Sequence, residues 1–250
     1  MTTNTSSGRI IWHELLTSDV EAAKGFYGEL FGWKSRTVEM GPMPYTLLSV
    51  GEKDIGGLIK AQSGSPRWLA YSSVADVDAA LKQATAGGAS IESPAVTVPT
   101  VGRFATIHHA HGGEIAPMTP ETAAPELDGA PALGTFCWDE LVTQDPAQAA
   151  AFLSKVFGYA SEEKPMGPMG SYTILKRGEK QAAGIMKAMQ PKLPAAWLGY
   201  VLVTDLDASH ARAKKLGATE LVPEISVPNL GRFTVLSDRQ GAMIGLFQGA

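Results

Sequence analysis

The sequence predicts an α+β fold built from four β-α-β-β-β modules, and two observations carry this prediction. The first is a tandem repeat, in which WHELLTSD at 12–19 returns as WDELVTQD at 138–145 and later segments return in the same order. The second is a weaker repeat within each copy, where a strand-like run is followed by an aspartate and then by apolar residues at helical spacing. Together they divide the chain into two copies of two modules.

The longest repeated segments show how far the duplication extends. SDVEAAKGFYGELFGW at 18–33 returns as QDPAQAAAFLSKVFGY at 144–159, and SPAVTVPTVGRFATI at 93–107 returns as VPEISVPNLGRFTVL at 222–236. Each copy has the size of an ordinary domain. The predicted domains are 9–118, with modules 9–62 and 66–118, and 134–250, with modules 134–190 and 195–250. The Pro- and Ala-rich segment 119–133 is predicted to be a linker, and polar residues 1–8 a disordered terminus.

An aspartate is predicted to begin the helix of each module, because its carboxylate accepts hydrogen bonds from the free amides of the first turn. These aspartates are Asp19, Asp76, Asp145 and Asp205. Pro146 stands at the first helical position of the third module, where its missing N–H costs nothing. Gly87 and Gly217 predict the ends of the second and fourth helices. Strand-like runs such as YTLLSV and IGGLIK follow the helices and complete the modules.

The composition favours a folded protein and argues against two classes of partner. Hydrophobic residues make up 44% of the 250 residues, which is enough for a sizeable core. The net charge is -4 and no basic run is present, so neither nucleic acid nor an anionic membrane is an expected partner. No stretch reaches the roughly 20 apolar residues of a membrane span. The single cysteine, Cys137, cannot form an internal disulfide, and a cytoplasmic location is expected.

Four such modules, paired into two domains, resemble the vicinal oxygen chelate superfamily, which includes glyoxalase I, extradiol dioxygenases and bleomycin-binding proteins. The resemblance rests on FYGELFGW at 26–33, on the helix starts VADVDAA and VTDLDAS, and on the late hairpin LSDRQGAMIGLF. It covers about residues 10–118 and 134–248. It implies that each pair of modules forms a glyoxalase-like half-open barrel whose concave cleft binds the ligand.

The resemblance also implies a metal ion in each cleft, with ligands from the first strand of each module and from the last strand. Carried over by position, the ligand positions hold Trp12, Leu69 and Ala116 in the first copy and Trp138, Leu198 and Gly245 in the second. These side chains cannot ligate Ni²⁺, Zn²⁺ or Fe²⁺, which take histidine, carboxylate or thiolate ligands. No metal ligand and no cofactor are therefore predicted, and a divalent metal remains only in the alternative below.

Strand alternation gives the repeated octapeptide a functional interpretation. Side chains two residues apart share a face, so Glu14 lies with Trp12 and Glu140 with Trp138. The two glutamates are the candidate catalytic or ligand-anchoring acids, although a structural ion pair or an exposed position is the alternative. The remaining candidate ligand-binding residues are aromatic: Tyr71, Phe104, Tyr200 and Phe233. Tyr45 and Tyr172 are further candidates whose face the sequence leaves open.

The other candidate ligand groups are interpreted as structural. His108, His109 and His111 lie near a hairpin where the second copy reads SDRQ, and a solvated turn is favoured because a metal site needs convergent ligands. His13 is expected to be packed or partly exposed, and His210 to lie on a helix surface. Cys137 is expected to be a buried, inert thiol beneath a helix.

Two functional hypotheses remain open. The first is a protein without a metal that binds a small apolar or aromatic molecule in two clefts. The second is a glyoxalase- or dioxygenase-type enzyme, with non-standard metal ligands such as Glu14 and His108, or with Glu14 or Glu140 as a general base. Four modules in one chain supply the pairing that shorter relatives obtain by dimerising, so a monomer or a weak homodimer is expected.

Overall fold

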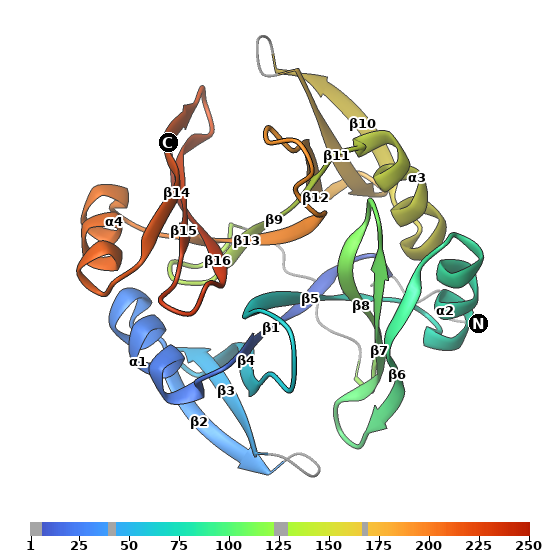
Figure 1. Ribbon diagram of the computed structural model, residues 1–250, viewed down its shortest axis with the longest axis horizontal. Coiled ribbons are helices and arrows are strands. Elements are labelled where there is room, and N and C mark those ends of the chain that lie inside the picture. Colours follow the sequence, from blue (N-terminus) through green and yellow to red (C-terminus); the bar gives the residue numbers. More distant parts are fainter. Residues whose placement is uncertain (1–6, 40–43, 123–129, 167–169) are drawn as a thin grey trace. The chain divides into compact units, whose positions relative to one another are not determined.

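The computed structural model describes residues 7–39, 44–122, 130–166 and 170–250. In this part of the chain the β-α-β-β-β module occurs four times, as predicted (Figure 1). The first module consists of β1 (Ile10–Thr17), α1 (Val20–Phe31), β2 (Lys34–Glu39), β3 (Pro44–Val50) and β4 (Lys53–Lys60). The second consists of β5 (Arg67–Ser73), α2 (Val77–Ala86), β6 (Ser90–Val98), β7 (Gly102–His109) and β8 (Gly113–Pro120).

The second copy of the repeat has the same order of elements. The third module consists of β9 (Phe136–Thr143), α3 (Pro146–Phe157), β10 (Ala160–Pro165), β11 (Ser171–Arg177) and β12 (Lys180–Lys187). The fourth consists of β13 (Ala196–Leu202), α4 (Leu206–Lys215), β14 (Thr219–Val227), β15 (Gly231–Ser237) and β16 (Met243–Gly249).

The strands form two eight-stranded sheets, one for each copy of the repeat. The strand orders are β2-β3-β4-β1-β5-β8-β7-β6 and β10-β11-β12-β9-β13-β16-β15-β14. In every module the first strand pairs in parallel with the last strand of the same module. The three strands that follow the helix pair with one another as antiparallel hairpins. Neither sheet closes on itself, so the α+β fold of half-open barrels is confirmed.

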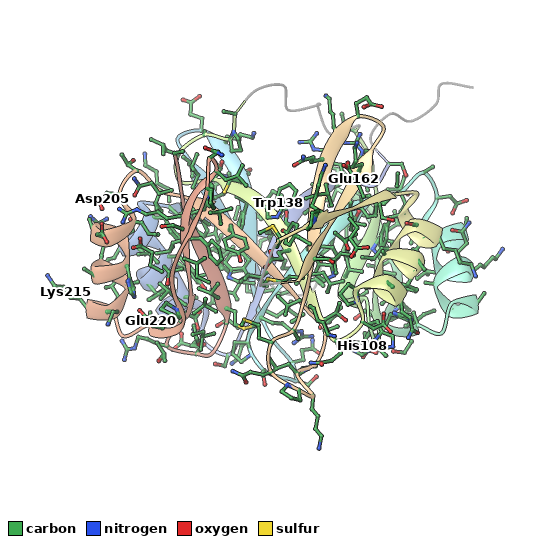
Figure 2. All side chains as sticks on the ribbon, turned by 90° about the horizontal axis from the view of Figure 1, so that it is seen from above. His108, Trp138, Glu162, Asp205, Lys215 and Glu220 are labelled. Carbon is green, nitrogen blue, oxygen red and sulfur yellow. The ribbon has the colours of Figure 1, made fainter. Side chains whose placement is uncertain are left out.

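All four helices begin directly after the predicted aspartates. In α4, for example, the Asp205 carboxylate accepts a hydrogen bond from the N–H of Ala208 at 2.9 Å. Figure 2 shows Asp205 and Lys215 at opposite ends of this helix, an arrangement that complements the helix dipole. Helices α1 and α3 end at Gly32 and Gly158 with φ of 74° and 76°, the left-handed conformation that favours glycine.

The chain forms two compact units, and each combines modules from both copies of the repeat. Unit 1 consists of Met1–Trp12, Leu69–Asp128 and Asp139–Trp197, and therefore holds the second and third modules. Unit 2 consists of His13–Trp68, Gly129–Trp138 and Leu198–Ala250, and holds the first and fourth. The predicted domain boundaries thus follow the two sheets, whereas the compact units follow the hydrophobic cores.

Each unit has a core in which helices cover one face of the strands. In unit 1, the buried residues Ile107 and Leu141 share a core with Leu153 of α3. In unit 2, Leu15 and Leu246 share a core with α1 and α4. Fully burying one leucine side chain contributes roughly 1.5–3 kcal/mol. The face of a module's strands opposite its own helix is called the helix-opposite face below, and it carries the candidate site.

The segments expected to be irregular are partly ordered. The N–H of Gly8 donates to the carbonyl of Ser73 at 2.7 Å, and the carbonyl of Ser7 accepts from Nε of Arg177 at 2.7 Å. The expectation of a disordered terminus is therefore wrong for residues 7–8, while 1–6 lie outside the described residues, as do 123–129 of the predicted linker. Within the described chain, every helix is too short or too polar to cross a membrane.

Candidate functional site

Glu14 and Glu140 lie on helix-opposite faces. The next residue on each strand, Leu15 or Leu141, is fully buried in the core of its unit. Since side chains alternate along a strand, each glutamate points away from the helix of its module. Glu140, in unit 1, is only 8% exposed, whereas Glu14, in unit 2, is half-buried. A carboxylate in such surroundings is costly unless it meets hydrogen-bond donors or a cation.

A tyrosine hydroxyl lies next to the strand that carries the first of these acids. Glu14 of β1 is the register partner of Gly57 on the parallel strand β4, so a side chain at Gly57 would point to the face of Glu14. The phenol of Tyr45 takes that space: a methyl group on Gly57 would overlap its oxygen. Tyr45 therefore lies on the same face of the sheet as Glu14. The sequence alone left the face of Tyr45 open.

The third module repeats this arrangement. Glu140 is the register partner of Gly184 on β12, and a methyl group on Gly184 would overlap the phenol oxygen of Tyr172. Both copies thus place an acid, a glycine and a tyrosine together, here called an acid–phenol pair. The signal for these tyrosines was the glycine inside each strand, IGGLIK and AAGIMK, because a glycine in a strand interior often marks the close approach of another group.

An aromatic wall in unit 2 contains the predicted residues of the second copy. The rings of Tyr200 and Phe233 meet edge to face, with centroids 5.6 Å apart. Leu198 is buried in the same cluster, and Trp138 packs against it. The Tyr200 ring lies over its register partner Gly245, where a methyl group would overlap it.

An equivalent wall lies in unit 1. The rings of Tyr71 and Phe104 also meet edge to face, with centroids 5.5 Å apart. Leu69 is 3% exposed, and Ala116 is fully buried as the register partner of Tyr71. Trp12 is half-buried and ends the first stretch of the same unit. Each unit therefore holds one aromatic wall and one acid–phenol pair.

These residues do not fit the metal that the superfamily implies. The positions carried over for its ligands hold indole, alkyl and glycine groups, none of which donates to a divalent cation. In the stretches that the structure describes, no group of three or more histidine, cysteine, aspartate or glutamate side chains is placed to hold a metal ion. The arrangement instead combines apolar walls with a few polar groups, which is the usual composition of a small-molecule site.

Known proteins share both the sequence and the fold. Residues 9–51 match the family model described as Bleomycin resistance protein-like N-terminal. One relative is CFP32 of Mycobacterium tuberculosis (strain CDC 1551 / Oshkosh), which is named as a glyoxylase by proposal. It is 31% identical over 256 residues, and the alignment covers 96% of this chain and 94% of that protein. The chain belongs to the vicinal oxygen chelate superfamily. Within it, the anthracycline biosynthesis protein DnrV of Streptomyces peucetius is 28% identical over 96% of this chain and 93% of its own length.

Solved structures of this superfamily have the same fold. The Mn(II)-bound glyoxalase from Novosphingobium aromaticivorans has a TM-score of 0.65 at 14% identity, covering 97% of this chain and 82% of its own. The homoprotocatechuate 2,3-dioxygenase from Arthrobacter globiformis has a TM-score of 0.67 at 15% identity, covering 98% and 80%. At these identities the similarity concerns the fold and not the reaction.

The histidine-rich turn differs from the prediction. His109 is half-buried, and its ring stacks on Phe152 with centroids 3.9 Å apart, so it is not a solvated turn residue. Its Nδ1 accepts a hydrogen bond from the N–H of Gly112 at 3.0 Å. Burial first, and then the neighbouring His111 and His108, lower the pKa of His109. His109 thus acts as a neutral acceptor within unit 1, while His108 is exposed.

Three other predictions have mixed outcomes. His13 is packed as expected, being 7% exposed and stacked on Phe136 at 3.7 Å. His210 is not a plain surface residue, because its Nε2 lies 2.9 Å from the Glu220 carboxylate and its side chain is partly buried. The prediction for Cys137 was wrong in position: it is half-buried, packs against the wall of unit 2, and its thiol donates to the carbonyl of Tyr200 at 3.3 Å.

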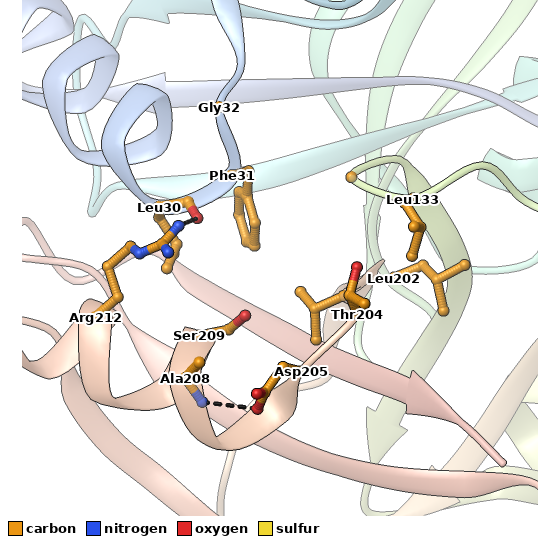
Figure 3. A pocket seen from close by; sticks show the side chains of 12 residues that line it. Leu30, Phe31, Gly32, Leu133, Leu202, Thr204, Asp205, Ala208, Ser209 and Arg212 are labelled. Atoms are coloured by element: carbon orange, nitrogen blue, oxygen red, sulfur yellow. Dashed lines mark hydrogen bonds between the residues drawn. The ribbon is translucent and has the colours of Figure 1, made fainter.

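A pocket of about 370 Å³ lies elsewhere in unit 2, where α1 ends and α4 begins (Figure 3). It is lined mainly by apolar side chains and by Arg212, which donates to the carbonyl of Leu30 at 3.3 Å. Its one carboxylate, Asp205, already caps α4. None of the predicted site residues lines it, so it is distinct from the candidate site.

Proposed function

We propose that the protein binds a small molecule with a flat apolar body on the helix-opposite faces of its strands, and that no metal ion bound by protein ligands takes part. One observation carries the proposal. The positions implied for metal ligands belong instead to two aromatic walls, in which tyrosine and phenylalanine rings meet edge to face. An aromatic wall replaces the implied metal ligands twice, once in each unit, and this repetition favours a shared role in binding.

The walls supply affinity through buried apolar area, roughly 25 cal/mol per Å² before the costs of binding are subtracted. The acids on the helix-opposite faces would supply orientation, because a carboxylate can accept a hydrogen bond from the ligand or face a positive charge on it. The proposed ligand therefore carries a hydrogen-bond donor or a positive charge toward Glu14 or Glu140. DnrV supports a flat polycyclic class of ligand, since anthracyclines are molecules of that kind.

The test combines a metal measurement with two probes. Extensively dialysed, untagged protein is expected to contain no stoichiometric Ni, Zn, Fe or Mn by mass spectrometry of the elements. Proflavine, a flat cation, and phenanthrene, a neutral flat molecule, are then titrated while tryptophan fluorescence is recorded. Quenching of Trp12 or Trp138 is the expected result. A stoichiometric metal that Glu14→Ala or His108→Ala removes would overturn the proposal.

An enzyme of the glyoxalase or dioxygenase type is the second candidate. The observation that favours it is the low exposure of Glu140, because a buried carboxyl group on a candidate ligand face is a candidate general base. The name of CFP32 points the same way. Conversion of a bound probe or of a 2-oxoaldehyde with glutathione, abolished by Glu140→Gln while binding persists, would establish this candidate in place of a pure binding role.

A further inference from the structure

We infer that the pocket at the end of α1 and the start of α4, here called the α1–α4 pocket, binds a small aromatic carboxylate. The site is separate from the aromatic walls, and the inference does not depend on the proposed function. All residues that line the pocket belong to unit 2. Its volume of about 370 Å³ lies within the range of ordinary ligand pockets, roughly 300–1,000 Å³.

The polar and apolar side chains of the pocket lie at different sides of it (Figure 3). Ser209 and Arg212 come from α4, whereas Leu133 and Leu202 lie at the other side, and the Phe31 side chain lies between the two groups. A ligand that fits has a polar end toward Arg212 and an apolar body toward the leucines. A ring is favoured for the body, because aromatic pairs gain attraction beyond their buried area.

The guanidinium of Arg212 selects the polar end of the ligand. Its Nη1 donates to the carbonyl of Leu30 at 3.3 Å, and in the stretches that the structure describes this is its one hydrogen bond. A guanidinium has five N–H donors and no acceptor, so most of its donors remain for a ligand. A carboxylate can accept two of them in parallel. The polar end should therefore be a carboxylate.

The hydroxyl of Ser209 adds a further donor on the same side. Ser209 and Arg212 are three residues apart on α4, and side chains at this spacing are neighbours on a helix surface. The Ser209 side chain is half-buried, and its hydroxyl makes no hydrogen bond to any other residue that the structure describes. It can therefore donate to the ligand carboxylate that Arg212 holds.

The one carboxylate that lines the pocket, that of Asp205, is held apart from Arg212. It accepts a hydrogen bond from the N–H of Ala208 at 2.9 Å, at the end of α4 where the helix dipole is positive. Asp205 precedes Arg212 by seven residues, which is about 10 Å along a helix axis. The negative end of the ligand is thus expected beside Arg212 and away from Asp205.

The other unit provides an internal comparison. Alignment of VTDLDAS with VADVDAA places Ala80 at the position of Ser209 and Gln83 at the position of Arg212. Ala80 is 4% exposed and belongs to the core of unit 1, whereas Ser209 lines the pocket of unit 2. The two polar side chains therefore belong to the fourth module and not to the repeat, which sets this site apart from the aromatic walls.

The experiment compares two probes of similar shape by NMR titration of isotope-labelled protein. 2-Naphthoate carries a carboxylate, and 2-methylnaphthalene has a methyl group in its place. Affinity is measured from the amide signals of Gly32 and Ser209, so binding at the aromatic walls is not counted. The wild type should bind 2-naphthoate about tenfold more tightly than 2-methylnaphthalene, or better, because hydrogen bonds between charged groups are the strong ones.

Three variants test the roles of the charge and the cavity. Arg212→Gln introduces the residue type that aligns with it in unit 1, and it should weaken 2-naphthoate about tenfold and change 2-methylnaphthalene affinity less than about twofold. Lys215→Gln removes a positive charge from the same helix outside the pocket and should keep the preference. Ala208→Trp fills the pocket from an exposed position and should abolish both shifts. Circular dichroism of each variant shows that it is folded.

Each outcome supports or overturns the inference. Equal affinity of the wild type for both probes, or no shift at Gly32 and Ser209, overturns it. It is also wrong if Arg212→Gln keeps the preference, if Lys215→Gln loses it as fully as Arg212→Gln does, or if Ala208→Trp still binds both probes. Shifts confined to the strands of the aromatic walls would support the proposed function and overturn this inference alone.

Discussion

The phenol of Tyr27 donates a hydrogen bond of 3.0 Å to the carboxylate of Asp238, and both side chains are buried in unit 2. The same oxygen accepts from Nε1 of Trp68 at 3.1 Å. Burial first, and then the charge of Asp238, raise the pKa of Tyr27, because both disfavour a phenolate. The phenol therefore keeps its proton and remains a donor, which joins α1 to the turn before β16.

Tyr27→Phe should lower the free energy of unfolding by about 1–3 kcal/mol, because a buried carboxylate then loses a donor. Tyr159→Phe removes a hydroxyl that bonds the neutral Ser72, so its cost should be smaller, about 1 kcal/mol. Urea unfolding of both variants measures the difference. If both variants lost the same free energy of unfolding, the charge of Asp238 would not explain the cost of Tyr27→Phe.

The stability of unit 1 should depend on the protonation of His109. Its folded-state pKa is lowered, so the folded chain binds fewer protons than the unfolded chain, whose histidines titrate near about 6.5. The neutral histidine contributes fully to the free energy of unfolding above pH ~6.5. This contribution is lost as the pH falls through that value toward the folded-state pKa. His109→Asn should flatten this part of the profile in urea unfolding between pH 5 and 8. If the free energy of unfolding of His109→Asn changed with pH as steeply as that of the wild type, His109 would not be the group responsible.

Gly57→Ala should displace the Tyr45 phenol and destabilise the fold by about 1–3 kcal/mol, as overpacking does. Gly25 is a matched control, because it lies in α1 with no atom within 4 Å of an added methyl group. Gly25→Ala should raise stability by about 0.5–1 kcal/mol, since alanine loses less freedom in a helix. Thermal and urea unfolding compare the two. A neutral Gly57→Ala would mean that the phenol moves aside without cost.

Glu14→Gln and Glu140→Gln keep the shape of each site and remove its charge. Proflavine affinity should fall about tenfold or more in the variant of the working site, because hydrogen bonds to charged groups contribute about 1.5–3 kcal/mol. Phenanthrene, which has no charge, should bind both variants as it binds the wild type. Isothermal titration measures both ligands. Equal proflavine affinity in all three proteins would exclude an acid-anchored site.

The modules were predictable from sequence because their signals are local. Asp76, for example, caps its helix with hydrogen bonds to residues only two and three positions away. The position of Tyr45 was not predictable, because its face depends on the pairing of β3 with β4 and on the space left by Gly57. The role of His109 was not predictable for a related reason, because its ring is buried against Phe152 of another module. Asp238, which aligns with His109 in the second copy, likewise accepts from turn amides.

The assignment of modules to units has a consequence for synthesis on the ribosome. The core of unit 1 is complete once Trp197 has been made, but the core of unit 2 joins Leu15 to Leu246. The segment that ends at Trp68 must therefore wait for nearly all the remaining chain, about 10–40 s at roughly 5–20 residues per second. During that time the apolar side of α1 has no partner from the fourth module. The nascent chain should then be most vulnerable to aggregation, and most in need of a chaperone, at its first quarter.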